Sequence, residues 1–323
     1  MTTRIGPAGL GCMGMSGIYG PADEAESIAT IHAALDAGIS LIDTGDFYGM
    51  GHNELLISRA LAGLDREDFQ LSVKFGAQRG PDGSWIGYNA SPPAVKTALA
   101  YSLVRLGTDH VDVYRPARLD AKVPIEETIG AIAELVQAGY VRRIGLSEVG
   151  AETIRRAAAV HPIADLQIEY SLLSRGIERE ILPVCRELGI AVTAYGILSR
   201  GVLSDSFAPG RELAPGDIRG RFPRFDGDNA QRNLELVRRL REIAADQGAS
   251  VAQVAIAWVG SRGADVVPLI GARRRDQLAE ALAALSHQLT ADQLEAIERA
   301  VPPGAAAGGR YGAPQMADLD SER

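Results

Sequence analysis

Short apolar segments alternate with amphipathic ones along most of the chain. The apolar segments have the length of buried strands, and the amphipathic ones repeat with the 3.6-residue period of a helix. In segment 25–37, for example, Ile28, Ile31 and Leu35 share one face, and the pattern stops at Gly38. The predicted strands are 10–15, 39–43, 70–74, 111–115, 144–147, 165–168, 191–195 and 266–270. The predicted helices are 25–37, 53–62, 91–106, 125–138, 179–188, 234–247 and 275–285.

The order of these elements predicts the fold class. Most of the helices stop at a glycine, which can adopt the left-handed conformation that ends a helix before a strand. Eight strands alternating with helices favour a (β/α)8 TIM barrel over a doubly wound sheet, because a barrel needs about 250 residues plus decoration. We therefore expect one domain over 1–323. Two surplus segments, a long loop at 198–229 and a flexible or loop-like tail at 302–323, are expected near the C-terminal face of the barrel.

Composition and charge narrow the class of protein. A net charge of −8 argues against a nucleic-acid-binding surface. No run of 18 apolar residues occurs and no apolar segment follows Met1, so we expect no membrane span, no secretory signal and a cytoplasmic protein. The two cysteines, Cys12 and Cys185, cannot form a disulfide framework or a Cys-rich zinc site. We expect no bound metal, and an oligomer stays open.

The glycines Gly9, Gly11 and Gly14 match the G-x-G-x-x-G pattern of dinucleotide-binding sheets. That pattern requires a strand before it and a helix directly after it. Only eight residues precede Gly9, and two more glycines and a proline follow Gly14 within seven residues. We therefore interpret the segment as a glycine-rich first strand whose backbone can be approached closely.

Polar residues end two consecutive predicted strands. Asp43 ends 39–43, Lys74 ends 70–74, and Tyr48 follows Asp43 by five residues. In a barrel, polar residues at the C-terminal ends of strands are typical of a catalytic site. The alternative is a structural ion pair between Asp43 and Lys74, with Tyr48 a loop aromatic. Only three of the 33 basic residues are lysines, which favours a lysine kept for its shiftable pKa.

These three side chains could together supply a proton. The ordinary pKa of tyrosine is about 10, and a neighbouring ammonium group would lower it. A carboxylate beside the lysine would keep that ammonium charged and in place. The result is a general acid that faces a carbonyl oxygen, and its reductant must be a bound cofactor.

Segment 38–49, Gly-Ile-Ser-Leu-Ile-Asp-Thr-Gly-Asp-Phe-Tyr-Gly, followed by Asn53 and Glu54, resembles the signature of the aldo-keto reductase superfamily. Further segments at 9–16, 145–147, 165–167, 194–201 and 268–273 fall in the order of that family, so the resemblance covers about residues 4–300. The chain is most similar to the bacterial and plant branch that also resembles the potassium-channel β-subunits.

The resemblance implies an NADPH-dependent reductase of a small carbonyl substrate, with Asp43, Tyr48 and Lys74 as catalytic residues. It implies that Ser147 and Gln167 hold the nicotinamide carboxamide. The other positions that it implies for contact with NADPH or NADP+ are Gly11, Met13, Asp43, Glu148, Tyr195, Gly196, Ile197, Leu198, Ser199, Arg200, Ile270, Gly271, Ala272, Arg273, Gln277, Glu280 and Ala281. Among these, Tyr195 would stack on the nicotinamide ring and Arg273 would bind the 2′-phosphate.

The chain departs from the family pattern after the predicted strand 111–115. The family has a catalytic histidine in D-x-Y-x-x-H-R-x-D, and Ala117 holds that place here. Arg115 could hydrogen-bond a carbonyl oxygen or the cofactor amide, or could form a structural ion pair with an acid on a neighbouring loop. Glu148 and Ala281 stand where the family has asparagines.

Three functions are compatible with these features. The first is NADPH-dependent reduction of an aldehyde or ketone, which the intact Asp43, Tyr48 and Lys74 favour. The second is a nicotinamide-bound sensor or regulatory subunit with little turnover, which Ala117 favours. The third is a barrel enzyme that uses Lys74 as a Schiff base, which leaves Tyr195 and Arg273 without a role.

Overall fold

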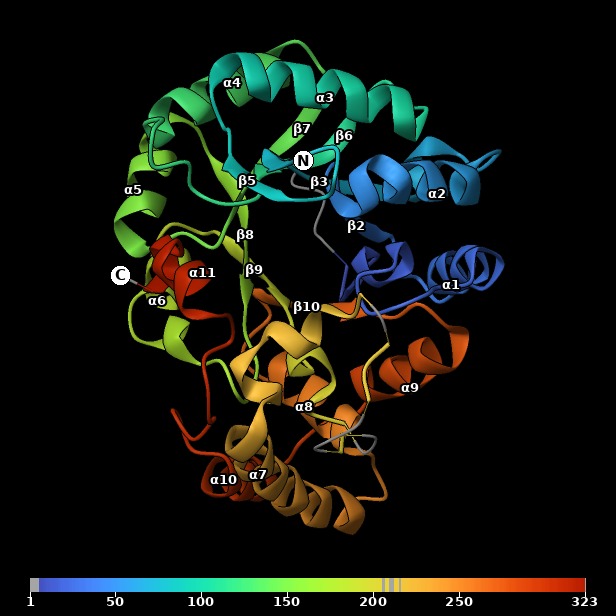
Figure 1. Ribbon diagram of the computed structural model, residues 1–323, viewed down its shortest axis with the longest axis vertical. Helices are drawn as coiled ribbons and strands as arrows, with labels where there is room; N and C mark the ends of the chain where they lie inside the picture. Colours follow the sequence, from blue (N-terminus) through green and yellow to red (C-terminus); the bar gives the residue numbers. More distant parts are fainter. Residues whose placement is uncertain (1–5, 205–206, 209–211, 215, 323) are drawn as a thin grey trace.

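Eight parallel strands form a closed barrel at the centre of the molecule (Figure 1). The computed structural model describes residues 6–204, 207–208, 212–214 and 216–322. Neighbouring strands follow the order β1-β10-β9-β8-β7-β6-β3-β2 around the barrel, which confirms the predicted (β/α)8 fold. The barrel strands are β1 Gly9–Gly11, β2 Leu41–Gly45, β3 Gln70–Phe75, β6 Val111–Pro116, β7 Val141–Ser147, β8 Ile163–Glu169, β9 Ala191–Tyr195 and β10 Val266–Gly271.

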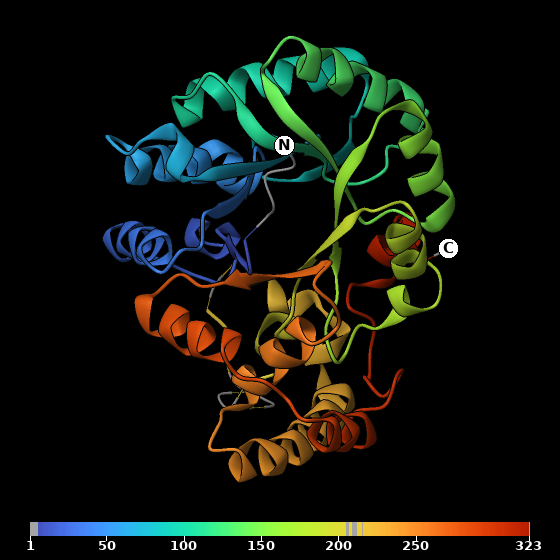
Figure 2. The ribbon, with the colours of Figure 1, turned by 180° about the vertical axis from the view of Figure 1, so that it is seen from behind.

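Helices surround the barrel, as the views from both sides show (Figures 1 and 2). They are α1 Glu24–Asp36, α2 His52–Leu61, α3 Pro92–Leu106, α4 Ile125–Gln137, α5 Ala151–Val160, α6 Ile181–Glu187, α7 Gly227–Asp246, α8 Val251–Gly260, α9 Arg275–Leu285, α10 Ala291–Ala300 and α11 Ala313–Ala317. None of the helices in the described ranges is both long and apolar enough to cross a membrane.

The structure adds elements that the pattern analysis missed. Both α8 and α10 begin with a capping box, in which Ser250 or Thr290 pairs with a glutamine three residues later. The pattern analysis missed α8 because it is buried over nearly its whole length and therefore lacks a polar face. An antiparallel hairpin, β4 Ala77–Arg79 and β5 Trp85–Tyr88, also follows β3.

The first strand is shorter than predicted. β1 ends at Gly11, and a 3-10 turn, Met13–Ser16, takes the place of the second half of the predicted strand. A Cβ atom at Gly9 would lie 2.8 Å from the side chain of Leu41 and 2.9 Å from that of Leu269. Glycine at this position therefore allows the first strand to pack closely between its two neighbours.

The loop after β9 and the C-terminal tail both reach the C-terminal end of the barrel. The loop forms 3-10 turns at Ser199–Gly201, Ile218–Arg221 and Pro223–Phe225, while 205–206, 209–211 and 215 lie outside the described residues. The tail contains α11 and a 3-10 turn, Asp320–Glu322, and Arg310 within it is only 5% exposed. The backbone nitrogen of Gly150 donates to Asp320 Oδ2 at 2.7 Å, which ties the tail to the start of α5.

Candidate active site

Asp43, Lys74 and Gln167 meet at the C-terminal end of the barrel interior. The Nζ atom of Lys74 lies 2.6 Å from Asp43 Oδ2, and the amide nitrogen of Gln167 donates to the same oxygen at 2.8 Å. All three side chains are buried. Burial lowers the pKa of Lys74, and the charge of Asp43 opposes that shift. The strands β2, β3 and β8 thus hold a lysine and a carboxylate in fixed contact.

Tyr48 begins a 3-10 turn, Tyr48–Gly51, directly beyond β2. The Lys74 ammonium lies 5.1 Å from the centre of its ring. Burial, followed by the charge of Asp43, raises the pKa of Tyr48 well above its ordinary value. This direction is opposite to the one expected from the sequence, because loss of hydration of the phenolate outweighs the nearby positive charges. Tyr48 is therefore protonated at neutral pH.

Arg115 lies in the barrel interior, on β6 beside Lys74 of β3. Its guanidinium donates to Asp165 Oδ2 at 2.8 Å and to Ser72 Oγ at 2.9 Å, and the residue is 0% exposed. Asp165 lies on β8, so the structural ion pair forms with an acid on a strand and not on a loop. Of the two roles expected for Arg115, the structure shows the ion pair.

Ala117 follows β6 directly and brings no hydrogen-bond donor in its side chain. Its backbone nitrogen donates to Phe75 O at 2.8 Å, and the residue is 2% exposed. The next residue, Arg118, is half-buried and donates from Nη2 to the Tyr311 hydroxyl at 3.2 Å. The end of β6 therefore presents a guanidinium group to the mouth of the barrel.

A buried hydroxyl group at the end of β7 has no hydrogen-bond partner among the described residues. Ser147 is 1% exposed, and its Oγ forms no hydrogen bond with any described residue. Buried hydroxyl groups are normally hydrogen-bonded. Gln167 pairs in register with Ser147, and its amide nitrogen is engaged by Asp43. A carboxamide, which both donates and accepts, fits these two side chains.

Glu148 joins the end of β7 to the C-terminal tail. Its carboxylate accepts from Arg310 Nη1 at 2.8 Å and from Arg310 Nη2 at 2.5 Å. It also accepts from the hydroxyls of Tyr195, at 2.7 Å, and Ser321, at 2.8 Å. Burial alone would raise the pKa of Glu148, but Arg310 outweighs burial and lowers it to about 2. Glu148 has a φ angle of 55°, in the left-handed region.

Glu169, at the end of β8, holds the loop after β9. Its carboxylate accepts from Arg200 at 3.2 Å and from Arg224 at 3.4 Å, and the carboxylate is fully buried. Arg224 also donates to Ser199 Oγ at 2.9 Å. Nothing in the local sequence around Glu148, Glu169 or Arg310 marks them as partners, so sequence reasoning missed this set. An acid that directly follows a strand in a barrel is the signal that could have suggested Glu148.

The hydroxyl of Tyr195 hydrogen-bonds both Glu148 and Tyr311 at the mouth of the barrel. Its hydroxyl lies 2.9 Å from the Tyr311 hydroxyl. The Arg200 guanidinium lies 4.6 Å from the centre of the Tyr311 ring and 4.5 Å from that of Phe222. The tail and the loop after β9 therefore meet over the site, and Tyr195 is held between them and Glu148.

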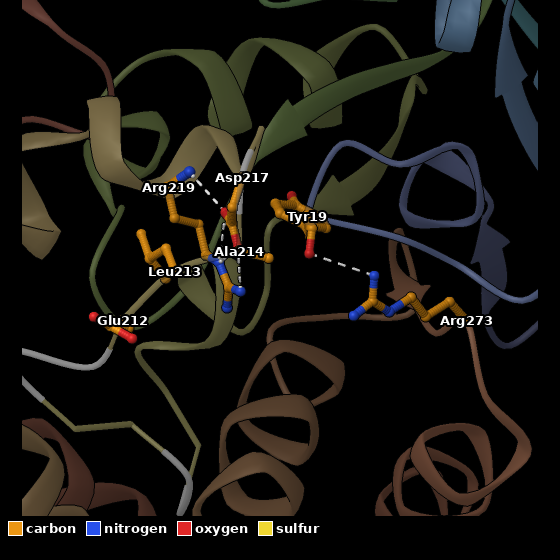
Figure 3. Close-up of a pocket in the computed structure, with 7 residues that line it drawn as sticks. All are labelled: Tyr19, Glu212, Leu213, Ala214, Asp217, Arg219 and Arg273. Carbon is orange, nitrogen blue, oxygen red and sulfur yellow. Dashed lines mark hydrogen bonds and ion pairs between the residues drawn. The ribbon is translucent and has the colours of Figure 1, made fainter.

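Arg273 lines a cavity of about 420 Å³ between the N-terminal segment and the loop after β9 (Figure 3). Its Nη1 donates to the carbonyl oxygens of Gly20, at 3.2 Å, and Pro21, at 3.1 Å. No salt bridge involves Arg273 within the described part of the chain, although its positive charge helps to lower the pKa of Asp217 in the same cavity. The other lining residues are Tyr19, Glu212, Leu213, Ala214, Asp217 and Arg219.

Only one arginine of the run 273–275 faces this cavity. Arg274 forms a salt bridge with Asp276 and Arg275 with Glu26, both at 2.9 Å and both exposed. Acids of α1 and α9 therefore neutralise two of the three arginines, and Arg273 alone of the run lines the cavity. Gln277 accepts from the backbone nitrogen of Arg273 at 3.2 Å.

The remaining positions implied for a cofactor lie along the same end of the barrel or on α9. Gly11 pairs in register with Gly271 and with Asp43, and Met13 begins the turn beyond β1. Glu280 accepts from Ser250 Oγ at 2.6 Å. The others fall beyond β9, at the end of β10 and on α9: Gly196, Ile197, Leu198, Ser199, Arg200, Ile270, Ala272 and Ala281.

Comparison with known proteins identifies similar chains over nearly the whole length. The profile of the aldo/keto reductase family matches residues 7–302. A probable aldo-keto reductase 1 from Glycine max is 41% identical over 311 residues, which cover 95% of this chain and 89% of the relative.

Solved structures are similar as well. The glycerol dehydrogenase from Gluconobacter oxydans superposes with a TM-score of 0.84 at 29% identity, covering 93% of this chain and 92% of its own. An aldo/keto reductase from Klebsiella pneumoniae, solved in complex with NADP and acetate, gives a TM-score of 0.72 at 27% identity, with 94% of both chains covered.

Proposed function

The chain belongs to the aldo/keto reductase family, and on that premise we propose that it reduces an aldehyde or a ketone to an alcohol with NADPH. The observation that carries the proposal is the contact of Lys74 with Asp43 at 2.6 Å, beside the ring of Tyr48 at 5.1 Å. A module that only bound a cofactor would need no buried lysine beside a protonated tyrosine.

NADPH, when bound, supplies a hydride to the carbonyl carbon. Ser147 and Gln167 would hold its carboxamide, since Ser147 Oγ is a buried group without a hydrogen-bond partner in the described part of the chain. Tyr195 would contact its nicotinamide ring. Arg273 would bind its 2′-phosphate, because its guanidinium lines a cavity and forms no salt bridge with a described residue.

Tyr48 would donate the proton that the carbonyl oxygen needs. Its raised pKa keeps the hydroxyl protonated, so the proton is present when negative charge develops on the substrate oxygen. Lys74 would stabilise the phenolate left behind, and Asp43 would hold Lys74 in place through a contact that burial strengthens. Phenolate formation therefore depends on a positive charge that the barrel has already fixed.

The experiment that tests this function follows NADPH absorbance over a panel of aldehydes and ketones, with wild type and Tyr48→Phe side by side. We expect turnover in wild type and its loss in Tyr48→Phe, with NADPH affinity measured by fluorescence unchanged. Full turnover in the variant would contradict the role of Tyr48.

A second candidate function rests on Ala117. The family's histidine donates to the carbonyl oxygen, and the methyl group of Ala117 cannot, which favours a nicotinamide-bound sensor or regulatory subunit with slow turnover. Within the family we place the chain near the branch that resembles the potassium-channel β-subunits. Single-turnover oxidation of bound NADPH by a small aldehyde separates the two functions, because a sensor would retain its NADPH.

A further inference from the structure

Three arginines at the mouth of the barrel are neutralised by acids. Arg310 forms a salt bridge with Glu148, and Arg200 and Arg224 form salt bridges with Glu169. The carboxylates of both glutamates are fully buried. Buried charges are stable only when paired and hydrogen-bonded, and these pairs meet that condition.

Arg118 is the exception among the arginines of the mouth. It is half-buried and forms no salt bridge within the described ranges. Its Nη1 donates to the carbonyl oxygen of Ala117 at 2.6 Å and its Nη2 to the Tyr311 hydroxyl at 3.2 Å. Both partners are uncharged, so a full positive charge with unused N–H donors remains beside the small side chain of Ala117.

Glu148, whose charge acts on Arg118, already accepts hydrogen bonds from other residues. The charge of Glu148 reaches Arg118, but no salt bridge joins them. The Glu148 carboxylate accepts from Arg310, Tyr195 and Ser321 and from the backbone nitrogen of Glu169. Rearrangement toward Arg118 would break bonds that hold the tail, so no acid among the described residues serves as a counter-ion to Arg118.

Arg118 lies within electrostatic reach of the reacting groups. Burial and the charge of Asp43 raise the pKa of Tyr48, and the positive charge of Arg118 opposes them. Arg118 also opposes the rise that burial causes in the pKa of Tyr88, at the end of β5. The guanidinium lies 6.0 Å from the centre of the Tyr311 ring. A ligand bound to Arg118 would therefore lie among tyrosines and close to the proton donor.

We propose that Arg118 determines substrate specificity by binding a carboxylate on the carbonyl substrate, so that the substrate class is an aldehyde or ketone that carries an acid group. The proposal rests on the reductase function proposed above. The carboxylate would form a charge-assisted, two-pronged contact with the guanidinium, which arginine is suited to make. The carbonyl end of the same molecule would then lie towards Tyr48.

The test compares 4-carboxybenzaldehyde with its methyl ester, which differ in the negative charge and little in shape. Wild type is expected to favour the acid in kcat/KM. Arg118→Met is expected to lower kcat/KM for the acid by roughly 10- to 100-fold, which is the effect expected from loss of one hydrogen-bonded charge pair. Its effect on kcat/KM for the ester is expected to be far smaller. Arg118→Lys keeps the charge but cannot make a two-pronged contact. Its kcat/KM for the acid is therefore expected to lie between those of wild type and Arg118→Met. Arg79→Met, an exposed arginine on the β4–β5 hairpin, is the matched control and should leave both values unchanged.

A binding measurement separates this inference from the reductase function. Calorimetry of both aldehydes on the NADP+ complex requires no hydride transfer, so it reports affinity even if turnover is absent. A loss of acid affinity in Arg118→Met with ester affinity and NADP+ affinity retained supports the proposal, whether or not the protein reduces the aldehyde. Equal losses for acid and ester, or no loss for either, would overturn it. Equal effects of Arg79→Met and Arg118→Met would also overturn it, because they would indicate a diffuse charge effect.

Discussion

Replacement of Glu148 by glutamine should destabilise the protein through the tail. The change keeps the shape of the side chain and removes the charge that two Arg310 donors, Tyr195 and Ser321 share. Arg310 is only 5% exposed. In the variant its remaining acidic partners would be Glu169, at 3.5 Å, and Glu322, which is partly exposed to solvent. Breaking one side of a buried ion pair is destabilising, because the remaining charge keeps fewer and more distant partners.

Two routes give the same magnitude for this loss. The pKa of Glu148 falls from 4.5 to about 2 in the folded protein, and at 1.36 kcal/mol per pKa unit the charged form is stabilised by roughly 3 kcal/mol. Removing one partner of a buried salt bridge typically costs about 3–5 kcal/mol. We therefore expect Glu148→Gln to lower the free energy of unfolding by about 3 kcal/mol at pH 7.

Urea unfolding of wild type and Glu148→Gln at pH 7 measures this loss. Glu187→Gln is the matched control, because Glu187 binds Arg155 in the same two-pronged way, at 2.7 and 2.6 Å, but on the surface. Trypsin provides a local readout, since release of the tail would expose the peptide bond after Arg310. Glu148→Gln should be cleaved there faster than wild type or Glu187→Gln.

The pH dependence of wild type tests the same contact. Because the folded-state pKa of Glu148 is depressed, its contribution is complete above about pH 4.5 and is lost as pH falls towards about 2. Glu148→Gln should lack this part of the acid dependence. Equal, small effects of Glu148→Gln and Glu187→Gln, with unchanged trypsin cleavage and an unchanged acid profile, would refute the reasoning.

Three further predictions concern the reaction. Lys74→Met should reduce kcat nearly as much as Tyr48→Phe, because the phenolate loses its positive neighbour; burst and steady-state kinetics measure this, and a near-normal kcat in either variant would contradict it. Arg273→Ala should lower the affinity for NADPH more than that for NADH in fluorescence titrations, since the 2′-phosphate loses a charged partner. An equal loss of affinity for both cofactors would assign Arg273 another role. Ala117→His should raise kcat/KM for small aldehydes, with an upper limit set by about 2.7–4 kcal/mol for one oxyanion donor, and should lower it for bulky carbonyls. If both substrates are unaffected in a folded variant, position 117 does not face the substrate.

Local sequence was sufficient for the barrel and for the first part of the site. The alternation of strand and helix periods requires only neighbours along the chain, so it predicted the eight barrel strands. Asp43 and Lys74 could be placed for the same reason, since each ends a strand and parallel strands bring their C-terminal ends to one face. The buried helix α8 was missed because a helix apolar on every side lacks the period that reveals an amphipathic one.

The pKa of Tyr48 and the role of Arg115 could not be determined from sequence. A pKa depends on the balance between burial and charge, and burial is a property of the packed structure. Arg115 ends a strand like Lys74, yet it points to Asp165, 50 residues away, and is fully buried. Lys74 and Arg115 are register partners on neighbouring strands, yet each pairs with a different acid, because the acid that each side chain meets is set by the packing of the barrel interior.

The sequence by itself determined the closed barrel and the presence of a lysine and a tyrosine at its C-terminal end, because these follow from periods of two and 3.6 residues and from the direction of parallel strands. The tertiary structure alone decided which charges are paired. Arg310 reaches Glu148 across 162 residues of chain and closes the tail over the mouth. Arg118, by contrast, forms no salt bridge with any residue that the structure describes. Ion pairs depend on distance in space, to which separation along the chain is no guide.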